Sequence, residues 1–107
     1  MIGGNIDAIL QQKTGSTVND IGERIPEWSD VQRLRGWLDL SAGEAKYTYH
    51  AKIQESTHVF VCDYVTIDRF AEGKRMLING MTYDVLLIDD PMELHQQLEI
   101  YLRYVGR

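Results

Sequence analysis

The dipeptide Asn79-Gly80 is the sequence feature that most constrains the fold. It separates two apolar runs, Arg75–Ile78 and Met81–Ile88. Asn-Gly in such a position is the strongest short-range signal for a β-hairpin, because both central residues of a type I′ turn adopt positive φ. The sequence therefore predicts two antiparallel strands joined by a two-residue turn.

A third strand is predicted at the end of the chain. The acidic corner Asp89-Asp90-Pro91 follows the hairpin and favours a turn, because the residue before a proline is held out of the helical region. After it, Gln97–Tyr104 alternates apolar and polar residues, which is typical of a half-buried strand. The connection is short, so this strand is expected to lie beside Met81–Ile88.

Three further strands are predicted upstream. Residues 5–13 alternate between apolar and polar side chains, and the run His58–Ile67 is apolar on both faces, as in a central strand. The segment Trp28–Leu40 fits either helical or alternating spacing. Gly36 would cost about 1 kcal/mol inside a helix, whereas a glycine suits a bent barrel strand, so a strand is favoured.

The remaining segments are predicted to be connections. Thr14–Glu27 is polar and contains turn residues, which indicates a long, mobile excursion. Ser41 is placed to cap a short helix over Ala45–Ile53, and the residues after it are expected to be loose up to Thr57. Because both Thr14–Pro26 and Ser41–Thr57 are poor in apolar residues, their backbone amides are expected to be the least protected. Asp68–Lys74 is expected to be a loop.

These elements define one mainly β domain. The chain has 107 residues, 44% of them hydrophobic, which is enough for a core without disulfides or metals. About six short strands and one short helix must either close on themselves or pack as two sheets. A small antiparallel β-barrel spanning residues 1–107 is the simpler solution.

The charge and cysteine content argue against several functional classes. A net charge of −5 disfavours nucleic-acid binding, and Arg33, Arg35 and Lys46 are interpreted as solvated residues. Cys62, the single cysteine, sits in an apolar run and is expected to be a buried small hydrophobe. We see neither a secretory signal nor an apolar run of membrane-spanning length, so synthesis and folding in a cytoplasm are expected.

No catalytic or cofactor-binding arrangement is predicted. The histidines His50, His58 and His95 lack metal-ligand spacing. The carboxylates of Asp89, Asp90 and Glu93 suit acid–base work or a hard cation, but turn chemistry explains them better. Among the six tyrosines, Tyr64 and Tyr83 are expected in the core, and exposed anchors for a partner are sought at Tyr47, Tyr49 and Tyr101.

The order of these features resembles a known family. It consists of a first strand, a polar excursion, a tryptophan before a strand that ends in Leu40-Ser41-Ala42-Gly43-Glu44, and the strand Val59–Tyr64. The run Ile78–Val85, the corner Asp89-Asp90-Pro91 and the run Leu98–Leu102 complete it. This arrangement is similar to the head–tail joining proteins of tailed bacteriophages, also called head-closure or stopper proteins.

The resemblance implies a structural protein of the virion neck with no enzymatic activity, no cofactor and no membrane association. It implies a ring, usually of twelve copies, between the portal/adaptor complex and the tail-completion protein. The segment Ser41–Thr57 would face the channel, where packaged DNA passes without specific binding, and help retain the genome. The candidate contact residues are therefore Ser41, Glu44, Lys46, Tyr47, Tyr49, Lys52 and Tyr101. A small β-barrel module that binds a peptide or an oligonucleotide remains the alternative.

Overall fold

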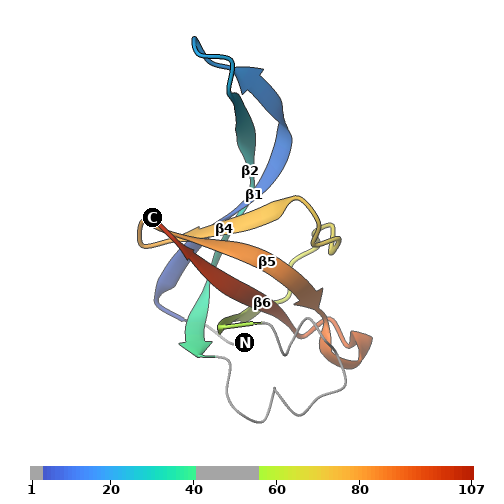
Figure 1. Cartoon of the computed structure of the whole chain (residues 1–107). Helices are drawn as coiled ribbons and strands as arrows, with labels where there is room; N and C mark the ends of the chain where they lie inside the picture. The colour runs from blue at the N-terminus through green and yellow to red at the C-terminus, as the bar shows by residue number, and fades with distance from the viewer. Residues whose placement is uncertain (1–3, 41–55) are drawn as a thin grey trace.

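The computed structural model describes residues 4–40 and 56–107 and contains six antiparallel strands in a closed barrel. The strands are β1 (Ile6–Val18), β2 (Arg24–Leu40), β3 (His58–Asp63), β4 (Lys74–Ile78), β5 (Met81–Asp89) and β6 (Gln97–Gly106). Around the barrel they run β1-β2-β3-β6-β5-β4. The predicted mainly β barrel of about six strands is confirmed (Figure 1). The predicted helix Ala45–Ile53 lies outside the described residues.

The inward-facing residues of all six strands form one core. Leu10, Phe60, Met76, Leu98, Ile100 and Leu102 are fully buried, and Tyr83 lies among them, as expected. Tyr64 is half-buried and packs against the same core. Alternation along β6 and β4 brings every second side chain inward, which is the period-2 pattern seen in the sequence.

The predicted hairpin and its neighbour are confirmed. Asn79 and Gly80 have φ values of 51° and 78°, so both turn residues are left-handed, and Ile78 pairs with Met81 across the turn. The last strand lies beside β5 as predicted. Between β5 and β6, Pro91–Glu93 forms a single 3-10 turn.

The segment Trp28–Leu40 is a strand, and Gly36 explains why. Gly36 pairs with Cys62 of β3, and a Cβ atom at Gly36 would lie 2.1 Å from the carbonyl oxygen of Val61. Only a residue without a side chain permits this approach of the two strands. The choice of strand over helix is confirmed.

Two sequence predictions are wrong. Thr14–Glu27 is not an irregular excursion, because β1 and β2 stay paired out to Val18 and Arg24. The low protection expected for this segment stays a prediction. The strand His58–Ile67 is also shorter than expected and ends at Asp63, whose partner Gln97 is the first residue of β6; beyond this pair the Tyr64 N–H donates to the Gln96 carbonyl at 3.3 Å.

Candidate interaction surface

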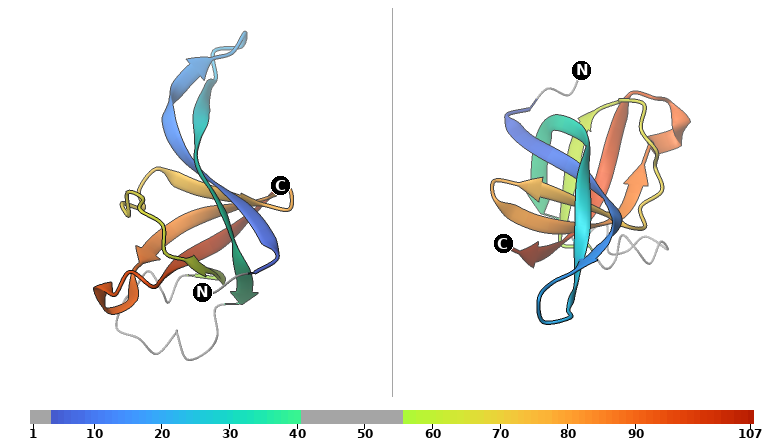
Figure 2. Two further views of the ribbon diagram at one scale, coloured as in Figure 1. Left: turned by 180° about the vertical axis from the view of Figure 1, so that it is seen from behind. Right: turned by 90° about the horizontal axis from the view of Figure 1, so that it is seen from above.

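The β1–β2 hairpin extends beyond the barrel as an arm, which we define as residues 13–28. Pairing between β1 and β4 ends at Gln12, and β2 meets β3 only from Gly36 onward. From residue 13 to residue 28 the hairpin is a two-stranded ribbon in which the residues are exposed except for the half-buried Asn19 and Trp28 (Figures 1 and 2). Such a ribbon is marginally stable alone. Its stability therefore depends on how the barrel anchors it.

The tip of the arm is a turn organised by Asn19. Its side-chain oxygen accepts hydrogen bonds from the backbone N–H groups of Ile21 and Glu23, at 3.1 and 2.9 Å. This turn presents Ile21 with 78% of its surface exposed. Val18 and Ile25, at 61% and 46%, lie on opposite faces of the ribbon, because Val18 pairs with Arg24 and Ile25 pairs with Thr17. Exposed apolar side chains at the end of a projecting element are typical of a contact surface.

A polar network across three strands anchors the arm. Arg75 of β4 donates from Nε to Gln11 of β1 at 2.8 Å, and Gln11 in turn donates to Asp30 of β2 at 2.8 Å. The guanidinium of Arg75 also lies 4.1 Å from the centre of the Trp28 ring. A cation over an indole face is attractive, and linked hydrogen bonds reinforce one another. The network holds the base of the arm in a fixed direction relative to the barrel.

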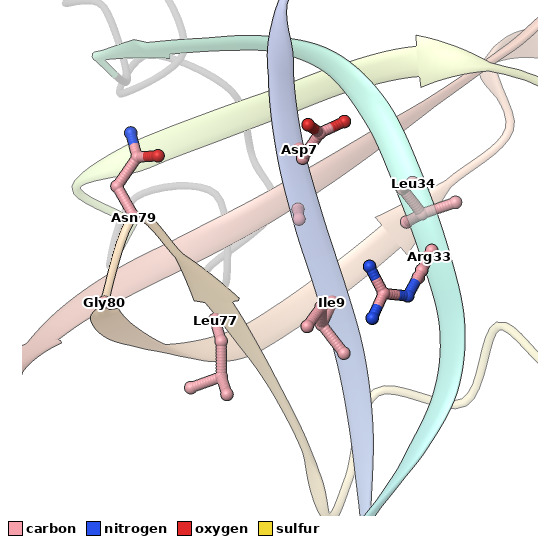
Figure 3. Close-up of a pocket in the computed structure, with 8 residues that line it drawn as sticks. Asp7, Ile9, Arg33, Leu34, Leu77, Asn79 and Gly80 are labelled. Carbon is pink, nitrogen blue, oxygen red and sulfur yellow. The ribbon is translucent and has the colours of Figure 1, made fainter.

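A pocket of about 300 Å³ lies on the barrel wall below the arm. Its lining includes Ile9 of β1, Leu34 of β2 and Leu77 of β4, and the turn Asn79-Gly80 closes one side. Figure 3 shows the guanidinium of Arg33 reaching back from β2 toward Ile9. Within the described residues Arg33 forms no ion pair, whereas its neighbour Arg35 pairs with Asp7 at 3.4 Å. The pocket thus combines an apolar floor with a cation at its rim.

Most of the predicted contact residues cannot be placed. Ser41, Glu44, Lys46, Tyr47, Tyr49 and Lys52 lie outside the described residues. Tyr101 is half-buried on β6, and its hydroxyl donates to Glu99 at 3.1 Å. Burial, followed by the Glu99 charge, raises the pKa of Tyr101 to about 12. Tyr101 as a partner contact stays a prediction.

The acidic corner is built around the buried carboxylate of Asp90. This group accepts a hydrogen bond from the His95 backbone N–H at 3.0 Å and contacts the His95 ring. Arg69 donates two hydrogen bonds to Glu93, at 3.1 and 3.0 Å, and lies 4.0 Å from Asp90. Asp90, Glu93 and His95 hold potential ligand atoms within 4.8 Å of one another, but the adjacent guanidinium opposes a cation there. The geometry agrees with turn chemistry.

Asp89 and Glu99 face each other directly across β5 and β6. Burial, together with the Glu99 charge, raises the pKa of Asp89. The folded state therefore holds this proton more tightly than the unfolded state, and ionisation at neutral pH costs stability.

We expect Asp89→Asn to stabilise the fold by about 0.5–1 kcal/mol at pH 7, because it removes a like-charge cross-strand pair. As the pH falls through the raised pKa of Asp89, the wild-type carboxyl becomes neutral and the gain should vanish. Urea unfolding at pH 7 and pH 3.5 measures both values. A gain that persisted at pH 3.5 would show that charge is not the cause. Asp84→Asn, which instead breaks the ion pair with Arg103, is the control expected to bring no gain.

The cysteine Cys62 lies in the barrel core. Cys62 is buried, and burial followed by the Asp63 charge raises the pKa of its thiol to about 11. A thiol of this kind is a poor nucleophile at neutral pH.

Within residues 4–40 and 56–107, no helix has the length and apolarity that a membrane crossing requires.

Sequence reasoning missed both the arm and the pocket. Beyond Trp28 at its base, the arm buries no face against the barrel, so no apolar alternation marks it. Its one local signal is Asn19 with Gly22 between residues that favour strands, which is compatible with a hairpin turn. The pocket depends on β1, β2 and β4 being neighbours, and sequence patterns do not specify that order.

Comparison with known proteins supports a phage origin. The chain is similar in structure to protein SF1141 from Shigella flexneri 2a, with a TM-score of 0.68 and 15% sequence identity. The similarity covers 97% of this chain and 95% of that one, and it shows the fold alone. A search of curated proteins finds no significant match. The family described as phage head completion protein matches residues 7–103. The chain therefore belongs to the phage head completion protein family.

Proposed function

We propose that this protein completes the neck of a tailed phage or prophage by forming a ring between the portal/adaptor complex and the tail. The family match over residues 7–103 carries the proposal, because it describes a structural protein of the phage head. Contacts with other head and tail proteins follow from that role. We further propose that the ring contains twelve copies, lies at the neck and helps to retain the packaged DNA.

The fold supports a role in assembly. The barrel core is formed outside the arm, so the arm is free to make contacts without weakening the core. The charge of −5 supports a channel that DNA passes rather than a surface that grips it, because like charges repel. The segment Ser41–Thr57 remains the proposed channel-facing part, with Ser41, Glu44, Lys46, Tyr47, Tyr49 and Lys52 as its candidate contacts. Its last two residues are not loose as predicted, because Ser56 is buried and the Thr57 N–H donates to the Leu102 carbonyl at 2.8 Å.

Deletion of the gene from its phage tests this function. Without a neck protein, heads should fill with DNA but then lose it or fail to join tails. Electron microscopy and nuclease sensitivity of the packaged genome measure these defects, and a plasmid copy of the wild-type gene should reverse them. Stable, tailed and infectious particles from the deletion phage would contradict the neck assignment. The barrel module for a peptide or an oligonucleotide would then take its place.

A further inference from the structure

The arm tip and the pocket below the arm are complementary, although one chain cannot bring them together. Ile9 in the pocket and Ile21 at the tip belong to the same hairpin, 12 residues apart. Nine of these residues extend along β1 as far as Val18, so at a rise of about 3.3 Å per residue the two sites lie on the order of 30 Å apart. The molecule itself is 46 Å long. Any contact between tip and pocket must therefore join two copies.

Each of the two surfaces carries an apolar group, and their unpaired charges are opposite. Ile21 is a single branched apolar side chain that projects from a narrow turn, and the pocket offers an apolar floor of Ile9 and Leu77, which pair across β1 and β4. Asp20 and Glu23 flank Ile21, and within the described residues neither side chain forms an ion pair. The rim of the pocket carries Arg33, which is also without an ion pair in the described part of the chain, whereas Asp7, the acidic residue of the lining, is paired with Arg35 at 3.4 Å. Arg24, the basic residue of the tip, is directed to Ser16 at 3.3 Å.

We propose that the arm tip of one copy docks in the pocket of the next copy, with Ile21 on the apolar floor and Arg33 beside the tip carboxylates. The two surfaces differ, so this contact is heterologous and passes from each copy to the next in one direction. Such a contact generates a ring when its rotation closes. The inference rests on the proposed function, because the neck supplies the ring in which copies lie side by side.

The contact is expected to be weak in solution. One side chain in a pocket of this size buries far less than the roughly 1,000 Å² of a stable interface. On a portal-type template, however, neighbouring sites hold the copies close together. The resulting high effective concentration allows the contact to form although its affinity is low. The free chain is therefore a monomer that associates only transiently at high concentration.

Disulfide trapping tests the contact in the full chain. Ile21→Cys and Leu77→Cys are made in separate chains, mixed at high concentration and oxidised. Cys62 is buried, so it contributes little background. In the matched control, Met92→Cys is used in place of Leu77→Cys. The Met92 side chain is 87% exposed and lies at the acidic corner. We expect the tip–pocket pair to form several times more cross-linked heterodimer than the control pair. Equal yields, including none from either pair, would overturn the proposal.

The chain that carries both Ile21→Cys and Leu77→Cys tests the direction of the contact. A heterologous contact predicts a ladder of cross-linked products, because each copy keeps one free tip and one free pocket. A product that stops at the dimer would indicate a symmetric contact and would overturn the proposal. Circular dichroism of each variant confirms that the barrel is folded before oxidation.

A charge exchange tests the part played by Arg33. Arg33→Glu should lower the trapping yield severalfold, and adding Asp20→Lys with Glu23→Lys in the same chain should restore it. Arg107→Glu, at the exposed end of the chain, is the control that should leave the yield unchanged. Failure of the charge exchange to restore trapping would contradict the pairing. These outcomes concern only the contact between copies. The neck function itself would be contradicted if the deletion phage still produced stable, tailed and infectious particles.

Discussion

Replacing Gly36 with alanine is expected to destabilise the barrel by about 3 kcal/mol or more, because its Cβ would lie 2.1 Å from the carbonyl oxygen of Val61. The obstacle is the backbone of β3, which cannot rotate away as a side chain can. Relief requires β2 and β3 to separate, and that separation disturbs the pairing from Gly36 to Leu40. For a domain of this size, such a loss lowers Tm by more than about 10 °C.

Thermal and urea unfolding measure this loss, and Gly80→Ala is the matched comparison. Gly80 has a φ of 78° but open space around its Cβ position, so alanine there costs only the left-handed strain, about 1 kcal/mol. The expected order of stability is wild type, then Gly80→Ala, then Gly36→Ala. If Gly36→Ala were as stable as Gly80→Ala, the close approach of β2 to β3 would be wrong.

Removing the arm is expected to abolish assembly while sparing the fold. The variant replaces residues 14–27 by Asn-Gly, which joins Lys13 and Trp28 through a two-residue hairpin turn. These two residues already pair across the hairpin. The thirteen hydrophobic residues that are buried within residues 4–40 and 56–107 all lie outside the deleted segment, so Tm should change little.

The loss in assembly follows from the exposed apolar side chains of the arm. Burying one such side chain is worth about 1.5–3 kcal/mol. The variant lacks Ile21, the side chain proposed to dock on the neighbouring copy, so each contact between copies should weaken by roughly tenfold to a hundredfold. A complementation assay with the deletion phage measures the titre of infectious particles. A folded armless chain that restored the full titre would show that the arm has no part in assembly.

The sequence predicted those parts of the fold that local chemistry determines. Asn79 and Gly80 adopt positive φ at little cost, as a type I′ turn requires, so the turn could be assigned from two residues. Gly36 is informative for a similar reason, because a glycine is costly in a helix and useful where strands approach. Apolar and polar residues alternate along β6 because one face of the strand is buried. This alternation is visible in the sequence, so the strand could be predicted.

The parts that could not be predicted depend on tertiary neighbours. Arg75, Gln11 and Asp30 lie on three different strands, and only the barrel order brings them into one network. The arm has no buried face, and its sequence therefore resembles a loop. Asp90 is an acidic residue before proline, and its complete burial against His95 depends on how the corner folds back on the barrel.

Electron cryomicroscopy of purified particles tests the central claim most directly. The phage that encodes the chain is imaged at its neck, and the six-stranded barrel with its projecting arm is sought in the reconstruction. The account predicts a ring of these barrels between the portal/adaptor complex and the tail, each arm reaching a neighbouring copy. Intact necks without this barrel, or a barrel located elsewhere in the particle, would contradict it.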